Sequence, residues 1–210
     1  MHFRVARGFR AVSDLGLTGH SFFSIFDDVF VTHPAGGKLE PRIANEIDSR
    51  LFRDVLGHYP SGITVIGGIH DHKPVGFTCQ SFYSVSISPP LISFSVSRSS
   101  KSWPVIRCTG RFSVNVLSNV QREVSDAFGS SKADRWEGID WIETTNGNPI
   151  IKGTLIWLDC DIYSEHEAGD HAIVVGRVRE VGSPEASVVR NPLVYFKGKY
   201  RDLNGEDGNQ

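Results

Sequence analysis

Serine alternates with hydrophobic residues in two neighbouring segments, and this alternation constrains the fold more than any other feature of the chain. The first segment covers residues 84–88 and the second covers residues 92–97. Successive side chains of a β-strand point to opposite faces, so each segment is expected to form a strand with one hydrophobic face and one face of small hydroxyls. Most of these hydroxyls are expected to face water, because serine is common on solvated strand faces.

The connections between the expected strands are short, which favours an antiparallel arrangement. Gly169 and Asp170 separate strands expected at 154–168 and 171–181, and this spacing is typical of a hairpin. The remaining strands are expected at 61–69, 74–87, 91–98, 111–117 and 193–200. Because most strands follow one another through turns rather than helices, the sequence predicts a mainly β fold, an antiparallel barrel with a few flanking helices.

Three helices are expected beside this barrel. Apolar residues four positions apart predict a helix over 47–60 that ends at Pro60. A short helix is expected at 100–110, and a third follows Ser118 and Gln121, which have the spacing of a capping box. The buried face of the third helix is expected to carry Val120, Val124, Ala127 and Phe128.

Composition and charge exclude several classes of protein. The formal net charge is −2, so the chain offers no basic field for nucleic acid. No apolar run reaches the ~18 residues that a membrane span needs. Three cysteines without a CxxC pair, together with scattered histidines, predict neither a disulfide framework nor a metal site. We therefore expect a cytoplasmic globular protein without a nucleic-acid or membrane partner.

The chain is expected to contain one main domain with an extension at each end. Residues 1–45 show no sustained period and are expected to form an N-terminal extension, which packs on the domain or on a second subunit because its phenylalanines are costly to leave in water. Residues 46–203 contain the expected strands and helices. Residues 204–210 are expected to form a flexible tail.

Two polar segments at the ends of expected strands suggest an anion-binding site. Residues 78–81 and 98–103 place hydroxyls and backbone amides at turns, where they can converge on one anion. A helix that begins near Lys101 would direct its free N–H groups and positive dipole end to the same point, and Arg98 adds a second charge. The chain contains neither a P-loop nor a GxGxxG motif. The spacing alone leaves open whether these segments hold a phosphate or only water.

Five segments of the chain resemble the flavin reductase family, whose members have the FMN-binding split-barrel fold. They are FRDVLGHYPSGITVI, GFTCQSFYSVSISPPLISFSVSRSSKSWPVIR, GRFSVNVL, EAGDHAIVVGRV and YFKGKY. The similarity covers residues 50–200 and implies that residues 46–203 form a flavin reductase-like split-barrel domain. Members of this family are the small reductase components of two-component flavin-dependent monooxygenases, and the chain is similar to nitrilotriacetate monooxygenase component B.

The resemblance implies three groups of flavin-binding residues. The flavin ring would be lined by Pro60, Ser61, Gly62, Ile63 and Thr64. The ring edge and ribityl chain would be followed by Thr78, Cys79, Gln80, Ser81, Ser84 and Val85. The phosphate would be held by Arg98, Ser99, Ser100, Lys101, Ser102 and Trp103. Gln80 stands where the family commonly has asparagine, and Lys101 stands where it usually has a small polar residue.

A Gly-Asp-His turn is implied to lie near the nicotinamide. Taken alone, one histidine at the start of a strand indicates only a solvated or hydrogen-bonded side chain. With the resemblance, His171 is expected to position NADH or NADPH, and Asp170 is expected to belong to the same cofactor-binding turn. Tyr200 is expected to border the pocket.

The resemblance implies an NAD(P)H:flavin oxidoreductase in which hydride passes directly from nicotinamide to flavin N5. The cofactors would be FMN or FAD with NADH or NADPH, and they would supply the chemistry. Backbone N–H groups at residues 79–81 would stabilise the charge of the reduced flavin. A homodimer is expected, with reduced flavin diffusing to a flavin-dependent oxygenase. Two alternatives remain open, a non-catalytic flavin- or haem-binding split barrel and an enzyme similar to pyridoxamine-phosphate oxidase.

Overall fold

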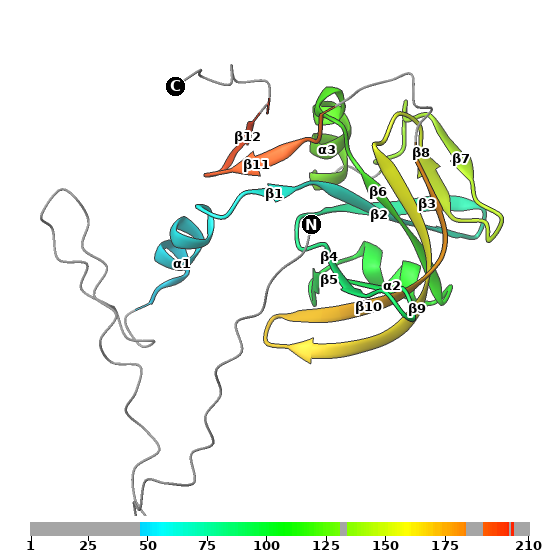
Figure 1. Cartoon of the computed structure of the whole chain (residues 1–210), viewed down its shortest axis with the longest axis horizontal. Coiled ribbons are helices and arrows are strands. Elements are labelled where there is room, and N and C mark those ends of the chain that lie inside the picture. Colours follow the sequence, from blue (N-terminus) through cyan, green and yellow to red (C-terminus); the bar gives the residue numbers. More distant parts are fainter. Residues whose placement is uncertain (1–46, 131–133, 184–190, 202, 204–210) are drawn as a thin grey trace, which may run out of the picture. The chain divides into compact units, whose positions relative to one another are not determined.

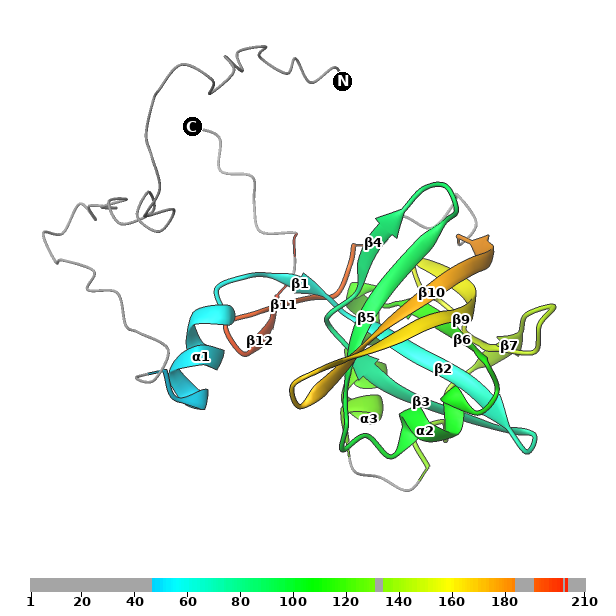
Figure 2. The same cartoon turned by 90° about the horizontal axis from the view of Figure 1, so that it is seen from below.

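The main sheet contains seven strands, and each is antiparallel to its neighbours (Figure 1 and Figure 2). The computed structural model describes residues 47–130, 134–183, 191–201 and 203, so the expected extension and tail lie outside the described residues. The order across the sheet is β3-β2-β6-β9-β10-β5-β4. The strands are β2 (Thr64–His70), β3 (Lys73–Cys79), β4 (Tyr83–Ser86), β5 (Leu91–Ser97), β6 (Arg111–Val116), β9 (Ile156–Ala168) and β10 (His171–Gly182).

The sheet curls into a barrel, and Ser81 joins its two sides. The N–H of Ser95, on β5, donates to the Ser81 hydroxyl at 2.8 Å, and that hydroxyl lies 3.1 Å from the Ser95 carbonyl oxygen. Because Ser81 follows directly after β3, these contacts link β3 to β5, which are not paired as strands. Figure 2 shows the strands wrapped around a common interior. The mainly β fold expected from the sequence is therefore confirmed.

Smaller elements surround the barrel in the described part of the chain. A three-stranded sheet is formed by β1 (Ser61–Gly62), β11 (Val194–Phe196) and β12 (Lys199–Arg201). A hairpin is formed by β7 (Trp141–Glu143) and β8 (Pro149–Ile151). The helices are α1 (Ser49–Leu56), α2 (Ser102–Arg107) and α3 (Arg122–Gly129), and a short 3-10 turn, η2 (Asn119–Gln121), precedes α3.

The barrel interior is an aromatic core that α2 helps to fill. The Trp103 side chain is 4% exposed, and its ring lies edge-on to Phe94 at 5.4 Å and to Phe112 at 6.3 Å between centroids. Such edge-to-face pairs are favoured by the quadrupoles of aromatic rings. Ile92, Phe94 and Val96 of β5 alternate with serines, as expected, and all three belong to this core. Burial of Trp103 therefore anchors α2 to β5 and β6.

A second core lies on the other face of β2. Val65 points into this cluster while the next residue, Ile66, belongs to the barrel interior. Phe128 of α3 packs here edge-on to Trp136, with 4.8 Å between ring centroids. The two faces of β2 are thus both covered, which explains its nearly continuous run of buried residues.

The helix predicted over 47–60 is shorter than expected. The Asp48 carboxylate accepts hydrogen bonds from the N–H groups of Arg50 and Leu51, both at 2.8 Å, so α1 begins with a side-chain cap. It ends at Gly57, whose N–H bonds to the Arg53 carbonyl oxygen, rather than at Pro60. The intervening residues lead into β1.

The structure also differs from the sequence pattern at four other places. The segment 74–87 is two strands, because the chain turns at residues 80–82 to reach the other side of the barrel. Residues 193–200 form a hairpin rather than one strand, with positive φ at Lys197 and Gly198. The hydrophobic residues at 84–88 are not buried. Val85 is 53% exposed because β4 is an edge strand that pairs only with β5, and Ile87 is 92% exposed in the turn that follows β4. Val120 is also exposed, by 69%, because it lies in η2 before the helix begins.

Gly176 of β10 permits the close packing of the barrel interior, and its substitution tests that packing. A Cβ atom at this position would lie 2.4 Å from Cζ of the buried Phe112. We predict that Gly176→Ala lowers the free energy of unfolding by about 1–3 kcal/mol, the usual effect of overpacking. Guanidinium unfolding measures this change. Gly62→Ala is the control, because no atom lies within 4 Å of its Cβ position. Equal stability of the two variants would contradict the packing described.

Candidate functional site

Three adjoining pockets follow the C-terminal half of β3, and Thr78 lines all of them. The first, called the phosphate groove below, has a volume of about 670 Å³ and lies between β3, residues 99–102, residues 128–129 and residues 134–136. The second, of about 270 Å³, reaches Tyr200. The third, called the His171 pocket, has a volume of about 410 Å³ and lies between β3 and β5. Because they share Thr78, the pockets form one continuous depression along the barrel.

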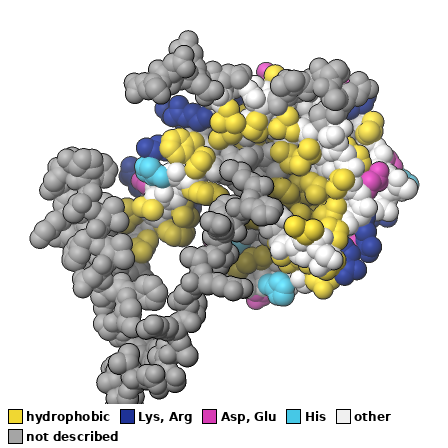
Figure 3. Space-filling view, in the orientation of Figure 1, with side chains coloured by type: hydrophobic (Ala, Val, Ile, Leu, Met, Phe, Trp, Pro, Cys, Tyr) yellow, Lys and Arg dark blue, Asp and Glu magenta, His cyan; other side chains and the backbone are white. Residues whose placement is uncertain are grey.

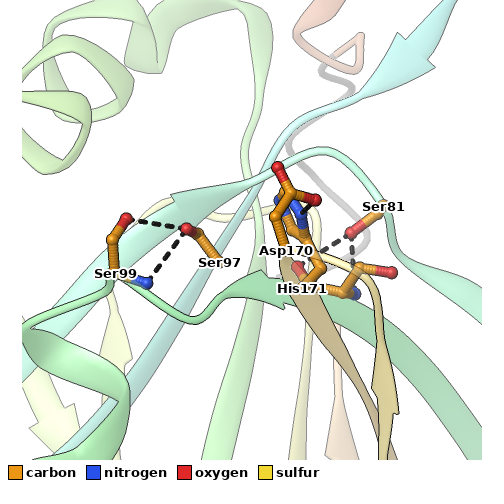
Figure 4. A network of polar contacts seen from close by, with 6 residues as sticks. Ser81, Ser97, Ser99, Asp170 and His171 are labelled. Atoms are coloured by element: carbon orange, nitrogen blue, oxygen red, sulfur yellow. Dashed lines mark hydrogen bonds and ion pairs between the residues drawn. The ribbon is translucent and has the colours of Figure 1, made fainter.

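The loop between β5 and α2 is shaped by its own serines, and this serine loop (residues 97–102) borders the phosphate groove and the His171 pocket. The Ser97 and Ser99 hydroxyls are 2.8 Å apart, and the Ser99 N–H donates to the Ser97 hydroxyl at 3.2 Å (Figure 4). The N–H of Trp103 donates to the Ser100 hydroxyl at 3.2 Å. Within the described residues, no hydrogen bond uses the N–H of Lys101 or Ser102. The loop therefore presents free donors beside several hydroxyls.

The structure changes the role expected of the helix after this loop. α2 has only six residues, and Pro104 in its first turn lacks an N–H. The helix dipole is consequently a minor contribution at this position, since it sums over few peptide units. The Trp103 indole lies in the core and donates through Nε1 to Glu165 Oε1 at 3.4 Å. Its side chain therefore supports the loop from behind rather than lining the groove.

Strand pairing brings the Gly-Asp-His turn next to the serine loop. His171 is directly opposite Ser97 in the β5–β10 register, and the N–H of Arg98 donates to the Asp170 carbonyl oxygen at 3.0 Å. His171 Nδ1 lies 2.7 Å from Asp170 Oδ1 (Figure 4). The hydrogen bond from His171, with the charge of that ring, holds the pKa of Asp170 below its usual value. The half-exposed His171 ring lines the His171 pocket.

Residues 78–81, four of the six predicted to follow the flavin edge, line the depression. Gln80 lines the second pocket, the His171 pocket and a fourth of about 710 Å³ beneath α1. Cys79 is buried, which raises the pKa of its thiol. The Ser81 hydroxyl is occupied by Ser95, as described above, and the Thr78 hydroxyl donates to the Ser125 carbonyl oxygen at 2.9 Å. Among residues 78–81, Gln80 therefore has the least constrained side chain.

The residues predicted to line the flavin ring are only partly accessible. Ile63 and Thr64 are buried, and the Thr64 hydroxyl donates to the Cys79 carbonyl oxygen at 2.9 Å. Ser61 lies at the surface, where its hydroxyl donates to Gln80 Oε1 at 3.4 Å. Ile63 lines the second pocket, and the exposed Pro60 and Gly62 lie on either side of Ser61. Of this segment, only Ile63 lines the depression directly, and Ser61 reaches it only through its contact with Gln80.

Several predicted residues line none of the four pockets: Pro60, Ser61, Gly62, Thr64, Ser84, Val85, Arg98, Trp103 and Asp170. Ser84 and Val85 are exposed on β4 and line none of the four pockets. The Arg98 side chain points to solvent, is 59% exposed and lies 3.9 Å from Glu167. Such a pair at the surface contributes little to stability.

Tyr200 lines the second pocket rather than the His171 pocket. Its hydroxyl donates to Asp126 Oδ1 at 2.5 Å and lies 3.0 Å from the Ser125 hydroxyl. Partial burial, and next the hydrogen bond to Asp126, raise the pKa of Tyr200. The Arg122 guanidinium lies 4.9 Å from the centre of the ring. These contacts fix the ring on α3.

One charged residue of the depression was missed by the sequence analysis. Arg135 lines the phosphate groove, and its Nη1 donates to the Gly76 carbonyl oxygen at 3.0 Å and to the Ser102 hydroxyl at 3.2 Å. It belongs to a connection with no motif, distant in sequence from the serine loop. The only local signal was the neighbouring Trp136, whose side chain is buried.

The donor set of the phosphate groove fits a phosphate. It offers hydroxyls, two free N–H groups and the cations Lys101 and Arg135. Asp134 also lines the groove, but its carboxylate accepts a hydrogen bond from the Trp136 N–H at 2.9 Å. Neutral and cationic donors of this kind bind phosphate oxygens.

Comparison with known proteins defines the class of this chain. Residues 56–204 match the family model "flavin reductase like domain", so the chain belongs to the flavin reductase family. It is 45% identical over 161 residues to the flavin-dependent monooxygenase reductase subunit HsaB of Mycobacterium tuberculosis, which covers 77% of this chain and 86% of that protein. It is 42% identical over 159 residues to a flavin reductase of Pseudomonas putida, with 75% and 92% covered.

Solved structures agree with this assignment. Nitrilotriacetate monooxygenase component B from Mycobacterium thermoresistibile has a TM-score of 0.74 at 40% identity, with 80% of this chain and 93% of that chain covered. The NADH:FAD oxidoreductase SgcE6 of Streptomyces globisporus, solved with NAD and FAD fragments, has a TM-score of 0.72 at 28% identity, with 80% and 99% covered. The resemblance and the split-barrel fold expected from the sequence are therefore confirmed.

Two features are absent from the described residues. These residues contain no helix that is both long and apolar enough to cross a membrane. They also contain no group of three or more histidine, cysteine, aspartate or glutamate side chains arranged to hold a metal ion.

Proposed function

We propose that the protein is an NAD(P)H:flavin oxidoreductase that supplies reduced FMN or FAD to a separate oxygenase. The observation that carries this proposal is the continuity of the phosphate groove and the His171 pocket through Thr78 and Ser100. The serine loop would hold the phosphate of a flavin, and Gln80 and His171 would lie along the same depression beside the rest of the molecule. Family membership supports the same reaction.

The chain's own residues are proposed to bind, orient and screen rather than to exchange protons. A bound flavin accepts hydride from a nicotinamide at N5, so the protein needs no nucleophile or general base. The serine loop would hold the phosphate, and backbone N–H groups at 79–81 would stabilise negative charge on the ring. His171, held by Asp170 at 2.7 Å, would place the nicotinamide. Correct placement of two bound reactants supplies much of the acceleration in such a reaction.

Neutral hydroxyls dominate the serine loop, and this favours flavin exchange over permanent binding. Each neutral hydrogen bond adds only about 0.5–1.5 kcal/mol, about half of what a charged partner adds. Reduced flavin can then leave for an oxygenase. Relatives named as reductase subunits of monooxygenases support this partner. A location in the cytoplasm stays a prediction, to which the three unpaired cysteines give support.

A turnover assay tests the proposed reaction. Purified protein is mixed with NADH or NADPH and free FMN, FAD or riboflavin, and the loss of the reduced nicotinamide absorbance is followed. We predict many turnovers per chain with at least one pair of cofactors. Stoichiometric flavin binding without turnover would support a storage or sensing protein instead. Oxygen-dependent consumption of pyridoxamine 5′-phosphate would support the third alternative.

The His171→Ala variant tests the proposed nicotinamide position. Because the ring lines the pocket and makes no contact that closes the barrel, we predict a KM for NADH raised about tenfold, the loss expected for one good polar contact. Flavin affinity, measured by fluorescence titration, should stay unchanged. His166→Ala is the control, because this exposed histidine contacts Ser164 and lines none of the pockets. Loss of flavin affinity with an unchanged KM for NADH would show that the role assigned to His171 is wrong.

A homodimer is proposed from the apolar surface of α1. This helix has no buried residue, and Phe52, Val55, Leu56 and Tyr59 are each more than half exposed. Figure 3 shows hydrophobic side chains over α1 and over a large part of the barrel on the same face. Exposed apolar areas of this kind mark interaction surfaces. We predict that light scattering gives twice the mass of the chain, and that Phe52→Ser with Val55→Ser lowers it. A monomeric wild type at all concentrations would contradict this.

A further inference from the structure

Arg135 differs from the other cations near the serine loop because its guanidinium group is held in place by the protein. Its guanidinium is partly buried and held on two sides, by the Gly76 carbonyl oxygen of β3 and the Ser102 hydroxyl at the end of the loop. A guanidinium carries five N–H donors in a planar fork. Both described hydrogen bonds use Nη1, and in the described chain Nε and Nη2 have no acceptor. The residue therefore keeps donors free for an anion.

The two cations of the serine loop, Arg98 and Lys101, are less well placed to bind a phosphate. The Arg98 side chain is directed towards Glu167 and lines none of the pockets. Lys101 lines the phosphate groove, but it is exposed, and no contact in the described residues fixes its ammonium group. A mobile, fully hydrated ammonium group loses side-chain entropy and water when it binds an anion. A guanidinium already fixed in place loses less.

The free donors of the serine loop are close to Arg135. The hydroxyl of Ser102 contacts Arg135 Nη1 at 3.2 Å, and the same residue has a free backbone N–H, as does Lys101. An anion that accepts from these N–H groups is within reach of the guanidinium. Arginine binds phosphate oxygens through two parallel hydrogen bonds, which gives both affinity and orientation.

We propose that Arg135 is the principal cation for the flavin phosphate and makes the chain select phosphorylated flavins over riboflavin. This inference rests on the proposed function. From the sequence, the positive charge at the phosphate was expected to come from Arg98 and Lys101. The principal charge would instead come from Arg135, which lies in the connection before β7. Arg135 also bonds to β3, so phosphate binding would be coupled to the strand that lines all three pockets.

Riboflavin provides the decisive comparison, because it has the same ring and ribityl chain without a phosphate. The steady-state KM for FMN, FAD and riboflavin is measured for the wild type, for Arg135→Gln and for Arg135→Lys. We expect Arg135→Gln to raise the KM for FMN and FAD about 10- to 100-fold, the usual range for a lost charged hydrogen bond. The KM for riboflavin should not change. Arg135→Lys should restore part of the preference for FMN.

Two controls separate charge from structure. Arg179→Gln removes the same charge from a surface pair with Asp161 on the outside of the barrel, and it should leave all three KM values unchanged. The double variant Arg98→Gln with Lys101→Gln should raise the KM for FMN less than Arg135→Gln does. If Arg135→Gln does not fold, the double variant still tests the proposal. Complete loss of the preference for FMN over riboflavin in the double variant would overturn it.

The remaining outcomes are also decisive. An unchanged KM for FMN in Arg135→Gln, or an equal rise for riboflavin, would show that Arg135 only supports the fold. A wild type that reduces riboflavin as well as FMN would show that the protein does not use the phosphate at all. A wild type that consumes no reduced nicotinamide with any of these flavins would instead contradict the proposed function itself.

Discussion

The packing of Trp103 against Phe94 and Phe112 determines where the candidate site can form. Trp103 directly follows the serine loop, and its indole ring is almost fully buried in the barrel interior. Burying such a ring contributes several kcal/mol, since aromatic side chains remove a large area from water. The loop before it consequently has one fixed end. Its other end is fixed by the pairing of Ser97 with His171 on β10.

The candidate site is therefore assembled from segments that are rigid for different reasons. The end of β3 is fixed by the sheet and by the contact of Ser81 with Ser95. The Gly-Asp-His turn is fixed by the β9–β10 hairpin, and Arg135 by its two hydrogen bonds. None of these elements encloses the depression, so a flavin can enter and leave. A protein that passes its product to another enzyme needs this combination of rigid walls and open access.

Much of the site was predictable because its residues are contiguous in sequence. The serine loop and the Gly-Asp-His turn each belong to a short segment whose polar residues sit at the end of a strand, and the pairing of β5 with β10 brings the two segments together. Arg135 was not predictable in this way. Nothing near it in sequence indicates that its guanidinium meets Ser102, because that contact depends on how the connection after α3 returns to the barrel. Trp103 shows the opposite error, since a residue next to phosphate-binding positions turned out to belong to the core.

By itself, the sequence determined the strand pattern, the antiparallel class of fold and the family, because these depend on local alternation, turn residues and long ordered segments. It did not determine which alternating strand is buried. In β5 the hydrophobic face fills the core, whereas in β4 the same pattern lies at an exposed edge. Only the tertiary structure decided that, and only it placed Arg135 beside the serine loop. The physical reason is the same in both cases: burial and charge proximity depend on which distant segments pack together, and that information is not contained in the spacing of neighbouring residues.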